Sequence, residues 1–207
     1  MSGAAGKTID LQRRYTVAEW REITQASESK YEYVDGRLID VRAMAGGTEN
    51  HALIEFNLAR ALGNALEGKP CRGLSSNMAV RAKQMARFRY PDASIVCGPS
   101  EFEEDDTRRT VLLNPRVIIE ILSETTEAAD RGEKFRDYQE ISSLREYLLI
   151  SQDQALVENF FRRDDGTWLI SNSSGISAVA KLHSVDVELR LSDLYAGVTL
   201  PKASDAI

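Results

Sequence analysis

The sequence predicts a single α/β domain of the α+β type, in which helices flank a mixed central β-sheet. Helical and strand-like patterns are interspersed along the 207 residues. Residues 117–122 form a continuous apolar run that contains one acid, Glu120, and such a run is typical of a strand buried on both faces. Residues 185–191 instead alternate apolar and polar side chains, as in a strand with one solvated face. These patterns indicate buried central strands followed by an antiparallel C-terminal part.

The length of the chain sets the expected domain organisation. Domains usually contain about 100–200 residues, so one domain is the expectation, and it spans residues 15–198. A flexible lead-in over residues 1–14 precedes it, and a tail over residues 199–207 follows it. A domain of this size buries a sizeable core without disulfides or a structural metal.

The N-terminal elements follow from local signals. Thr16 and Glu19 are spaced as a capping box, which predicts a short helix after Thr16. Asp35-Gly36 separates two β-prone runs, and this dipeptide predicts a hairpin because both of its positions favour positive φ. Residues 48–66 carry leucines and Phe56 at helical spacing and are predicted to form the longest helix.

The remaining elements are predicted from periodicity and turn residues. A helix is expected over residues 126–141 and a short helical piece near Leu194. The expected strands, besides those already named, are residues 78–81, 93–97, 146–150, 156–161 and 168–171.

Charge and hydropathy restrict the partners. The chain has 26 Lys and Arg against 32 Asp and Glu, a net charge of −6, so it cannot hold nucleic acid through its global field. Any such contact must be local.

No apolar run approaches the roughly 18 residues that span a bilayer and no secretory segment is evident, so we expect a cytoplasmic protein with no membrane partner.

Missing motifs exclude several other functional classes. The chain contains no Gly-rich phosphate loop and no Gly-x-Ser-x-Gly elbow, and its two histidines, His51 and His183, are too far apart for a HExxH zinc site. Cys71 and Cys97 form no CxxC pair, which excludes zinc ribbons and thioredoxin-type sites. We interpret both cysteines as strand or loop residues without a special role, in a reducing compartment.

Two acids in or beside apolar strands are the first candidates for chemistry. Glu120 lies within an apolar run, where a carboxylate is costly to bury without a partner or a metal. Asp92 follows Pro91 and opens the apolar run 93–97. Carboxylates on neighbouring strands can bind Mg²⁺ or Mn²⁺, which would polarise a phosphodiester and activate water. The alternatives are a strand glutamate that reaches an arginine and an ordinary turn aspartate.

A basic segment directly precedes Asp92. Arg81, Lys83, Arg87 and Arg89 lie close together, with no acid among them. Four cations beside a metal site could bind a phosphate backbone. The alternative is a solvated edge strand that its basic residues protect from aggregation.

The ordered set of motifs resembles a known family. The set consists of Tyr-Glu-Tyr-Val-Asp-Gly at 31–36, His51, Pro91-Asp92, Glu120-Ile121-Leu122-Ser123, Asp130-Arg131-Gly132-Glu133-Lys134, Tyr138 and Glu146-Tyr147. Together these residues look like the Uma-two family of endonucleases, within the restriction-endonuclease-like PD-(D/E)XK superfamily. The resemblance extends from about residue 15 to 195, nearly the whole chain.

The resemblance implies a restriction-endonuclease-like core and a metal-dependent nuclease. It assigns Asp92 and Glu120 as the carboxylates that bind Mg²⁺ or Mn²⁺, and nucleic acid, with DNA as the expected form, as the substrate. Glu32 matches an early acidic position and would be a further ligand or orient one; the alternative is a hairpin glutamate that faces water. His51 matches a position near the start of the long helix, where it would touch the site or a phosphate, although a lone histidine there is more often an ordinary polar contact.

The resemblance also supplies a lysine. In the superfamily a lysine lies two residues after the glutamate, a place that Leu122 occupies here, and the family's lysine on the following helix corresponds to Lys134. Asp130, Lys134 and Tyr138 are spaced to share one helix face, so Asp130 and Tyr138 are possible accessory residues. Lys134 would hold or deprotonate the attacking water; the alternative is a solvent-facing Asp–Lys pair.

Departures from the family pattern support a rival function. Glu124-Thr125-Thr126 replaces the usual Pro-Ser-Thr and adds a carboxylate near the expected site. A catalytically silent protein of the same fold, which binds nucleic acid or a protein partner, is therefore the alternative.

A homodimer is expected as well, because related nucleases often pair to cut two strands and the C-terminal strands are apolar.

Overall fold

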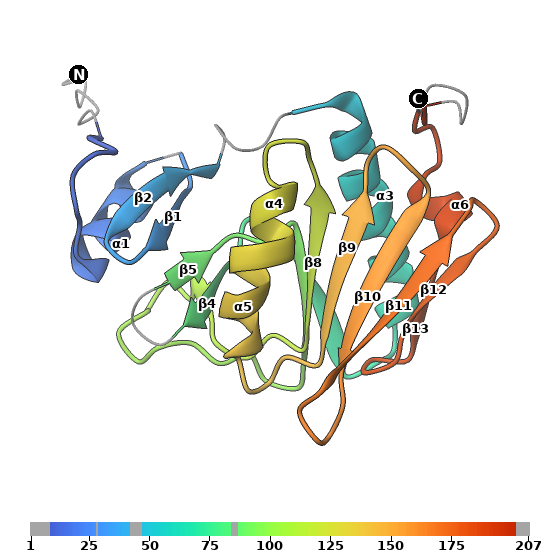
Figure 1. Cartoon of the computed structure of the whole chain (residues 1–207). Helices are drawn as coiled ribbons and strands as arrows, with labels where there is room; N and C mark the ends of the chain where they lie inside the picture. Colours follow the sequence, from blue (N-terminus) through green and yellow to red (C-terminus); the bar gives the residue numbers. More distant parts are fainter. Residues whose placement is uncertain (1–8, 28, 42–46, 84–86, 202–207) are drawn as a thin grey trace.

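The computed structural model describes residues 9–27, 29–41, 47–83 and 87–201 (Figure 1). The first eight residues of the expected lead-in and the expected tail from residue 202 onward lie outside the described residues. Among the described residues, no helix is long and apolar enough to cross a membrane.

The centre of the molecule is a six-stranded mixed sheet (Figure 1). From one edge to the other its strands are β11 (Trp168–Ser174), β10 (Leu156–Arg162), β9 (Glu146–Ser151), β8 (Val117–Leu122), β6 (Ala93–Cys97) and β3 (Cys71–Ser75). Strands β8 and β9 are parallel, and every other pair is antiparallel. All six residues of β8 are buried, which confirms that this strand is covered on both faces.

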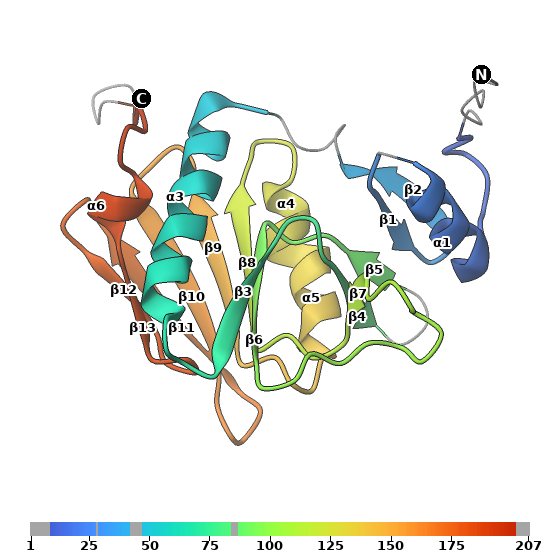
Figure 2. The ribbon, with the colours of Figure 1, turned by 180° about the vertical axis from the view of Figure 1, so that it is seen from behind.

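Helices cover the two faces of this sheet. The long helix α3 (Glu49–Leu66) lies on one face, beside β3 (Figure 2). The other face is covered by a helical segment of three parts, which are α4 (Glu127–Ala129), a π-helical turn η1 (Asp130–Lys134) and α5 (Phe135–Gln139). Because side chains alternate along β8, its odd-numbered residues join the core with α3 and its even-numbered residues face the three-part segment.

A second sheet of five strands holds the N-terminal hairpin. Its order is β2 (Arg37–Asp40), β1 (Tyr31–Val34), β5 (Arg87–Arg89), β4 (Ala79–Lys83) and β7 (Val111–Leu112). Helix α1 (Val17–Ala26) packs on it through Trp20, whose ring stacks on Phe88 with 4.4 Å between centroids. This packing joins the hairpin, which carries Glu32, to the strand that carries Arg89.

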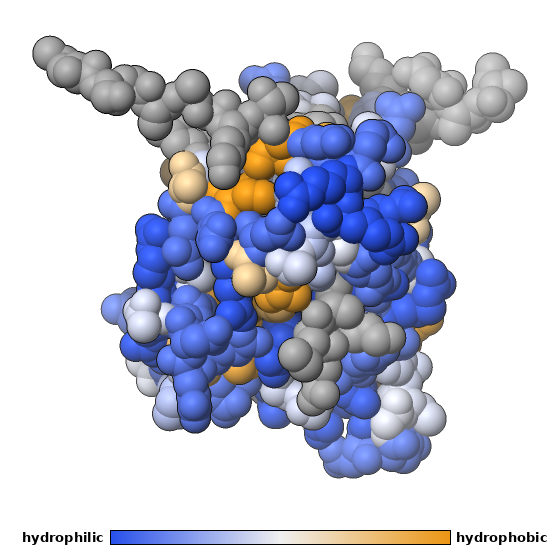
Figure 3. Space-filling model, turned by 90° about the vertical axis from the view of Figure 1, so that its left-hand side faces the viewer, coloured by the Kyte–Doolittle hydropathy of each residue, from blue (hydrophilic) through white to orange (hydrophobic). Residues whose placement is uncertain are grey.

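The sequence patterns of the N-terminal part are confirmed. Thr16 and Glu19 form the expected capping box at the start of α1. Asp35 and Gly36 have φ of 49° and 90° and form the expected hairpin turn. Seen from the side of α1, β1 and β2, the surface is mostly hydrophilic, with one hydrophobic area near its upper centre and a smaller one at its centre (Figure 3).

The C-terminal part closes the domain as the alternating pattern indicates. Strands β12 (Val179–Leu182) and β13 (Val187–Arg190) pair antiparallel, and the short helix α6 (Leu191–Leu194) follows directly. Their buried side chains join the core beneath α3. Sequence patterns did not predict β3, β5, β7 or β12. Strands β3, β7 and β12 lie at sheet edges and β5 has only three residues, so each carries too few apolar residues to show a period.

The two cysteines are joined, which corrects the interpretation that they have no special role. Cys71 and Cys97 are directly opposite in the β3–β6 pair, with 3.9 Å between their Cα atoms, and form a disulfide. The sequence could not show this, because the pairing depends on the register of two strands. A disulfide is typical of oxidising compartments, so the cysteines no longer favour a reducing one.

Reduction of this disulfide should destabilise the protein. The bond closes a loop with a sequence separation of 26 residues. Closing a loop of that length lowers the entropy of the unfolded chain and stabilises the fold by roughly 3.5 kcal/mol. We expect urea denaturation to show a loss of that size in the free energy of unfolding with a reductant present. A Cys71→Ser/Cys97→Ser variant should match the reduced protein and show no further response to reductant. Equal stability of oxidised and reduced wild type would contradict the prediction.

Candidate active site

Asp92 and Glu120 lie on neighbouring strands in the middle of the six-stranded sheet. Asp92 directly precedes β6, Glu120 is the fourth residue of β8, and Ala93 is the partner of Ile119 in the antiparallel pair. The Asp92 carboxylate accepts a hydrogen bond from the backbone N–H of Ile121, with 2.6 Å from N to Oδ2. Both acids line a cavity of about 40 Å³, together with Glu32, His51 and Lys134 among others. The structure thus brings the two acids to one site.

Lys134 reaches this cavity from the helical segment that covers the sheet. Its Nζ is 2.8 Å from Asp130 Oδ1, 3.2 Å from Glu120 Oε1 and 3.9 Å from Glu32 Oε1. Burial by itself lowers the pKa of Lys134, but the carboxylates of Glu120, Glu32 and Asp130 outweigh burial and raise that pKa above its ordinary value. These carboxylates favour the protonated form of Lys134, which can donate a hydrogen bond to water or to a phosphate oxygen.

Lys134 and Tyr138 converge on Glu120, and Asp130 pairs with Lys134, so the three residues share one helix face as their spacing predicts. The Tyr138 hydroxyl donates a hydrogen bond to Glu120 Oε1 at 2.8 Å, the atom that Lys134 also approaches. All three side chains are buried, so the alternative of a solvent-facing Asp–Lys pair is wrong. The π-helical turn contains both Asp130 and Lys134, and such turns often mark functional sites.

The site holds more negative charge than its cations balance. Burial raises the pKa of Glu120 well above its ordinary range, Lys134 opposes that shift, and the carboxylates of Asp130, Asp92 and Glu32 add to it. Burial likewise raises the pKa of Asp130, against the influence of Lys134. A divalent cation between Asp92 and Glu120 would relieve this repulsion, and carboxylate oxygens are its preferred ligands. The residues therefore fit the expected metal.

The number of protein ligands for such a metal is small. Among the described residues, no three acidic, imidazole or thiol groups are placed to hold a metal ion together. Mg²⁺ is usually bound by one or two carboxylates and keeps several waters. Asp92 and Glu120 alone would meet that requirement and would leave positions open for substrate.

Glu32 does not face water, so that alternative is wrong. Its side chain is 1% exposed, and its Oε2 lies 2.8 Å from Arg89 Nη1. Its Oε1 accepts a hydrogen bond from the backbone N–H of Tyr90 at 3.2 Å. Arg89 also forms an ion pair with Asp137, with 2.9 Å between Nη2 and Oδ2. Glu32 thus ties the hairpin to the segment before Asp92 and approaches Lys134.

The described side chains of the basic segment are paired with acids, which removes Arg89 from the expected phosphate contacts and leaves those of Arg81, Lys83 and Arg87 as predictions. Arg89 is 3% exposed and paired with acids on two sides, so it cannot reach a DNA backbone. Arg87 pairs with Asp35 at 2.6 Å and with Asp137 at 2.5 Å. Arg81 pairs with Glu103 at 2.7 Å. The side chain of Lys83 lies outside the described residues.

His51 lies at the site, in the first turn of α3. Its Nε2 is 3.5 Å from Asp92 Oδ1, and this contact raises the pKa of His51 despite partial burial. The N-cap of α3 fixes the first turn of the helix, which carries His51, because Thr48 Oγ1 accepts a hydrogen bond from the backbone N–H of His51. Glu124 does not line the 40 Å³ cavity; it is exposed and borders a neighbouring cavity of about 330 Å³.

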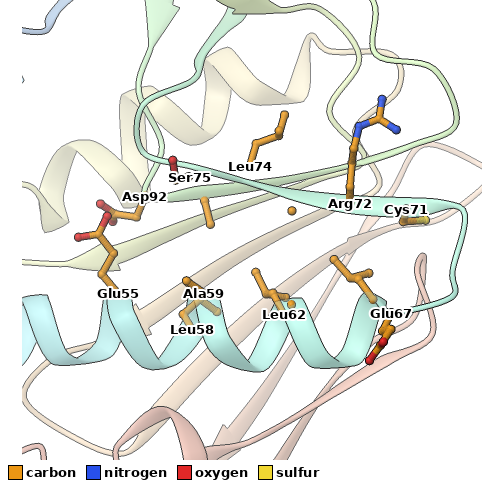
Figure 4. A pocket seen from close by; sticks show the side chains of 14 residues that line it. Glu55, Leu58, Ala59, Leu62, Glu67, Cys71, Arg72, Leu74, Ser75 and Asp92 are labelled. Atoms are coloured by element: carbon orange, nitrogen blue, oxygen red, sulfur yellow. The ribbon is translucent and has the colours of Figure 1, made fainter.

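Sequence reasoning missed Glu55. This residue lies one helical turn after His51, and its carboxylate and that of Asp92 point toward one another (Figure 4). Glu55 Oε1 accepts a hydrogen bond from Ser76 Oγ at 2.9 Å. A cavity of about 490 Å³ reaches Asp92 past Glu55, His51 and Lys30. The i, i+4 spacing of His51 and Glu55 was the available signal, because such residues share a helix face.

Comparison with known proteins agrees with the fold and the motifs. The sequence model of the Uma2 family, described as "Putative restriction endonuclease", matches residues 17–193. "Uncharacterized protein slr1290" of Synechocystis sp. is 31% identical over 180 residues, 87% of this chain and 90% of that protein. "Uncharacterized protein sll1609" of the same organism is 29% identical over 163 residues, 79% of this chain and 89% of that protein.

A solved structure shows the same fold. The crystal structure of "a putative nuclease belonging to DUF820" from Anabaena variabilis superposes with a TM-score of 0.70 at 17% identity and covers 89% of this chain and 99% of its own. Such low identity supports only the fold, which is that of the restriction-endonuclease-like nucleases. With the family match over most of its length, the chain is a member of the Uma2 family.

Proposed function

We propose that this chain is a metal-dependent endonuclease that hydrolyses phosphodiester bonds in nucleic acid, with DNA as the expected substrate. The observation that carries the proposal is the convergence of Asp92, Glu120 and Lys134 on one small cavity. Membership of a family described as restriction endonucleases agrees with it. Pairing of two chains, which would let the enzyme cut both strands, stays a prediction for sedimentation.

Each residue of the site has a separate task. Asp92 Oδ2 accepts from the Ile121 N–H and its Oδ1 lies 3.5 Å from His51 Nε2, and these two contacts fix the carboxylate at the edge of the cavity. Glu120 is held by Tyr138 and Lys134. Mg²⁺ or Mn²⁺ bound between these acids would polarise the phosphodiester and lower the pKa of a bound water. The Lys134 ammonium would donate to that water or to a phosphate oxygen and offset the negative charge that develops there.

Arg89 is a positioning residue in this scheme. It fixes Glu32 from the side opposite Lys134, and Asp137 fixes Arg89 in turn. Because Glu32 and Glu120 both raise the pKa of Lys134, the Arg89–Glu32 pair helps to keep the ammonium charged and in place.

The proposal is tested by incubating the protein with supercoiled plasmid and Mg²⁺ or Mn²⁺. We expect nicked or linear DNA with either metal and intact plasmid with a chelator, because the two acids cannot activate water without a cation. Restoring the metal in excess over the chelator should restore cleavage. Cleavage that persists in the chelator would contradict the proposed chemistry.

One observation favours the alternative of a silent nuclease fold that binds nucleic acid or a protein. The Lys134 ammonium already lies between Glu120 and Asp130 and neutralises part of the charge that a metal would otherwise balance. If the fold is silent because it binds no metal, Mg²⁺ and Mn²⁺ would produce no nicking. They would also leave the melting temperature unchanged, because a ligand stabilises a protein only by binding its folded state.

A further inference from the structure

A groove of about 430 Å³ extends from the candidate active site along α3 and the edge strand β3 (Figure 4). Its floor consists of Leu58, Leu62 and Leu66, whose side chains are buried against the sheet. Asp92 lines both this groove and the small cavity that contains Glu120. A molecule bound in the groove would therefore lie directly beside Asp92.

Small residues keep the groove open. Gly73 is on the floor side of β3, and a Cβ built there would be 3.8 Å from Leu66 Cδ1 and 3.9 Å from Leu62 Cβ. On the helix side, Ala59 and Gly63 line the groove and are exposed. Among the described strands, β3 pairs with β6 alone, so no strand covers its outer edge. The result is an apolar slot between two low rims.

The polar groups of the groove select the kind of ligand. Glu55 and Asp92 are at one end and Glu67 is at the other, whereas Arg72 points away from α3 (Figure 4). Carboxylates repel phosphate but accept hydrogen bonds from the amino groups of bases. Apolar walls suit the flat faces of a base. The lining thus matches a nucleobase and does not match a sugar–phosphate backbone.

We propose that the groove binds one unpaired base of the substrate, next to the phosphate that is cut, and that Glu55 accepts a hydrogen bond from its exocyclic amino group. This inference rests on the proposed function, because it is the continuity with Asp92 that identifies the ligand as part of a nucleic acid. A base in a duplex is stacked and paired and must leave the helix before it can enter such a slot. The preferred substrate is therefore single-stranded or locally unpaired at the cut.

Filling the groove tests the proposal. Gly73→Val adds a branched side chain to an edge strand, where it suits the backbone, and directs it at the leucine floor. The probe is a short single strand that contains 2-aminopurine, with Ca²⁺ as the cation so that binding is measured by fluorescence and not by cleavage. We expect wild type to bind it and Gly73→Val to bind roughly 5- to 150-fold more weakly, the usual loss for one base contact. Gly73→Ala, which meets its neighbours at ordinary distances, should show a smaller loss.

Matched controls separate the groove from general effects. Ser171→Val adds similar apolar surface to β11, the opposite edge of the same sheet, and should leave binding unchanged. In Glu55→Gln the amide oxygen can still accept from Ser76, which leaves the NH₂ group, a donor, to face the base. The variant should therefore lose the preference for oligo-dC, which offers an amino group, over oligo-dT, which does not. The melting temperature of each variant is measured to check that the variant is folded.

The outcomes distinguish this proposal from the proposed function. Equal binding by wild type, Gly73→Ala and Gly73→Val overturns the groove as a base site, whether or not the wild type nicks plasmid. Equal binding of duplex and single strand by wild type overturns it as well. Binding that depends on Gly73, without cleavage in any metal, supports the groove while the nuclease proposal fails.

Discussion

Asp92→Asn and Glu120→Gln should each reduce metal-dependent plasmid nicking by about a thousandfold, since a bound metal ion lowers the activation free energy by several kcal/mol and each variant would lose that effect. Both substitutions keep the shape of the side chain and one of its oxygens. The amide oxygen at position 92 can still accept from the Ile121 N–H, and the one at position 120 can still accept from Tyr138, so the fold should survive. Initial rates of nicking, measured with Mg²⁺ and with Mn²⁺, give the size of the effect.

Metal binding provides a second measurement for the same pair. Wild type should melt at a higher temperature with millimolar Mn²⁺ than with chelator, and neither variant should show this rise. Asp193→Asn, at an exposed acid on α6, is the matched control and should behave as wild type. Nicking by both variants at the wild-type rate would show that the site is misassigned. An unchanged wild-type melting temperature together with absent nicking would favour the silent fold.

Lys134→Met should cost both activity and stability. Without the ammonium, cleavage should fall by roughly 10²- to 10³-fold, the usual cost of removing one donor that stabilises developing negative charge. Removal of one partner from a buried charge pair typically costs about 3–5 kcal/mol, and Glu120 and Asp130 would both lose theirs. Lys181→Met, at an exposed lysine of β12, is the control and should change neither quantity.

The stability loss of Lys134→Met should depend on pH in a defined direction. In the wild type, burial already raises the pKa of Glu120 against the influence of Lys134, so removal of Lys134 raises it further. Because the pKa of Glu120 is higher in the folded protein than in the unfolded chain, the folded protein binds more protons than the unfolded chain above pH 4.5, the ordinary pKa of a glutamate. The free energy of unfolding of the variant should therefore fall as pH rises above this value.

Urea denaturation with a chelator present measures this dependence. The deficit of Lys134→Met relative to wild type should be larger at pH 8 than at pH 5, because at pH 5 the carboxyls can be protonated in the folded state. A deficit that is the same at both values would mean that the ammonium does not compensate buried carboxylates. A variant with full activity would exclude Lys134 from the reaction.

Several features were predictable because they depend on neighbours in the chain. The capping box of α1, the turn at Asp35-Gly36 and the burial of β8 follow from local chemistry and periodicity. The common helix face of Lys134 and Tyr138 follows from their spacing. The family resemblance named Asp92 and Glu120, and the family match confirms the family itself but does not test these two roles.

Other features depend on register and burial, which the sequence does not display. The basic segment suggested a phosphate contact, but the side chain of Arg89 turns inward because Glu32 and Asp137 from two other elements are there to pair with it. The link between Cys71 and Cys97 required the alignment of β3 with β6.

The sequence by itself therefore determined the kinds of elements, the family and the acids around which a site could be built. Only the tertiary structure decided how these charges are shared: Glu32 and Lys134 are buried partners, and Glu55 joins Asp92 at the end of an apolar groove. The physical reason is that periodicity and capping act over a few residues, whereas the pairing of buried charges depends on which distant segments the folded core brings together.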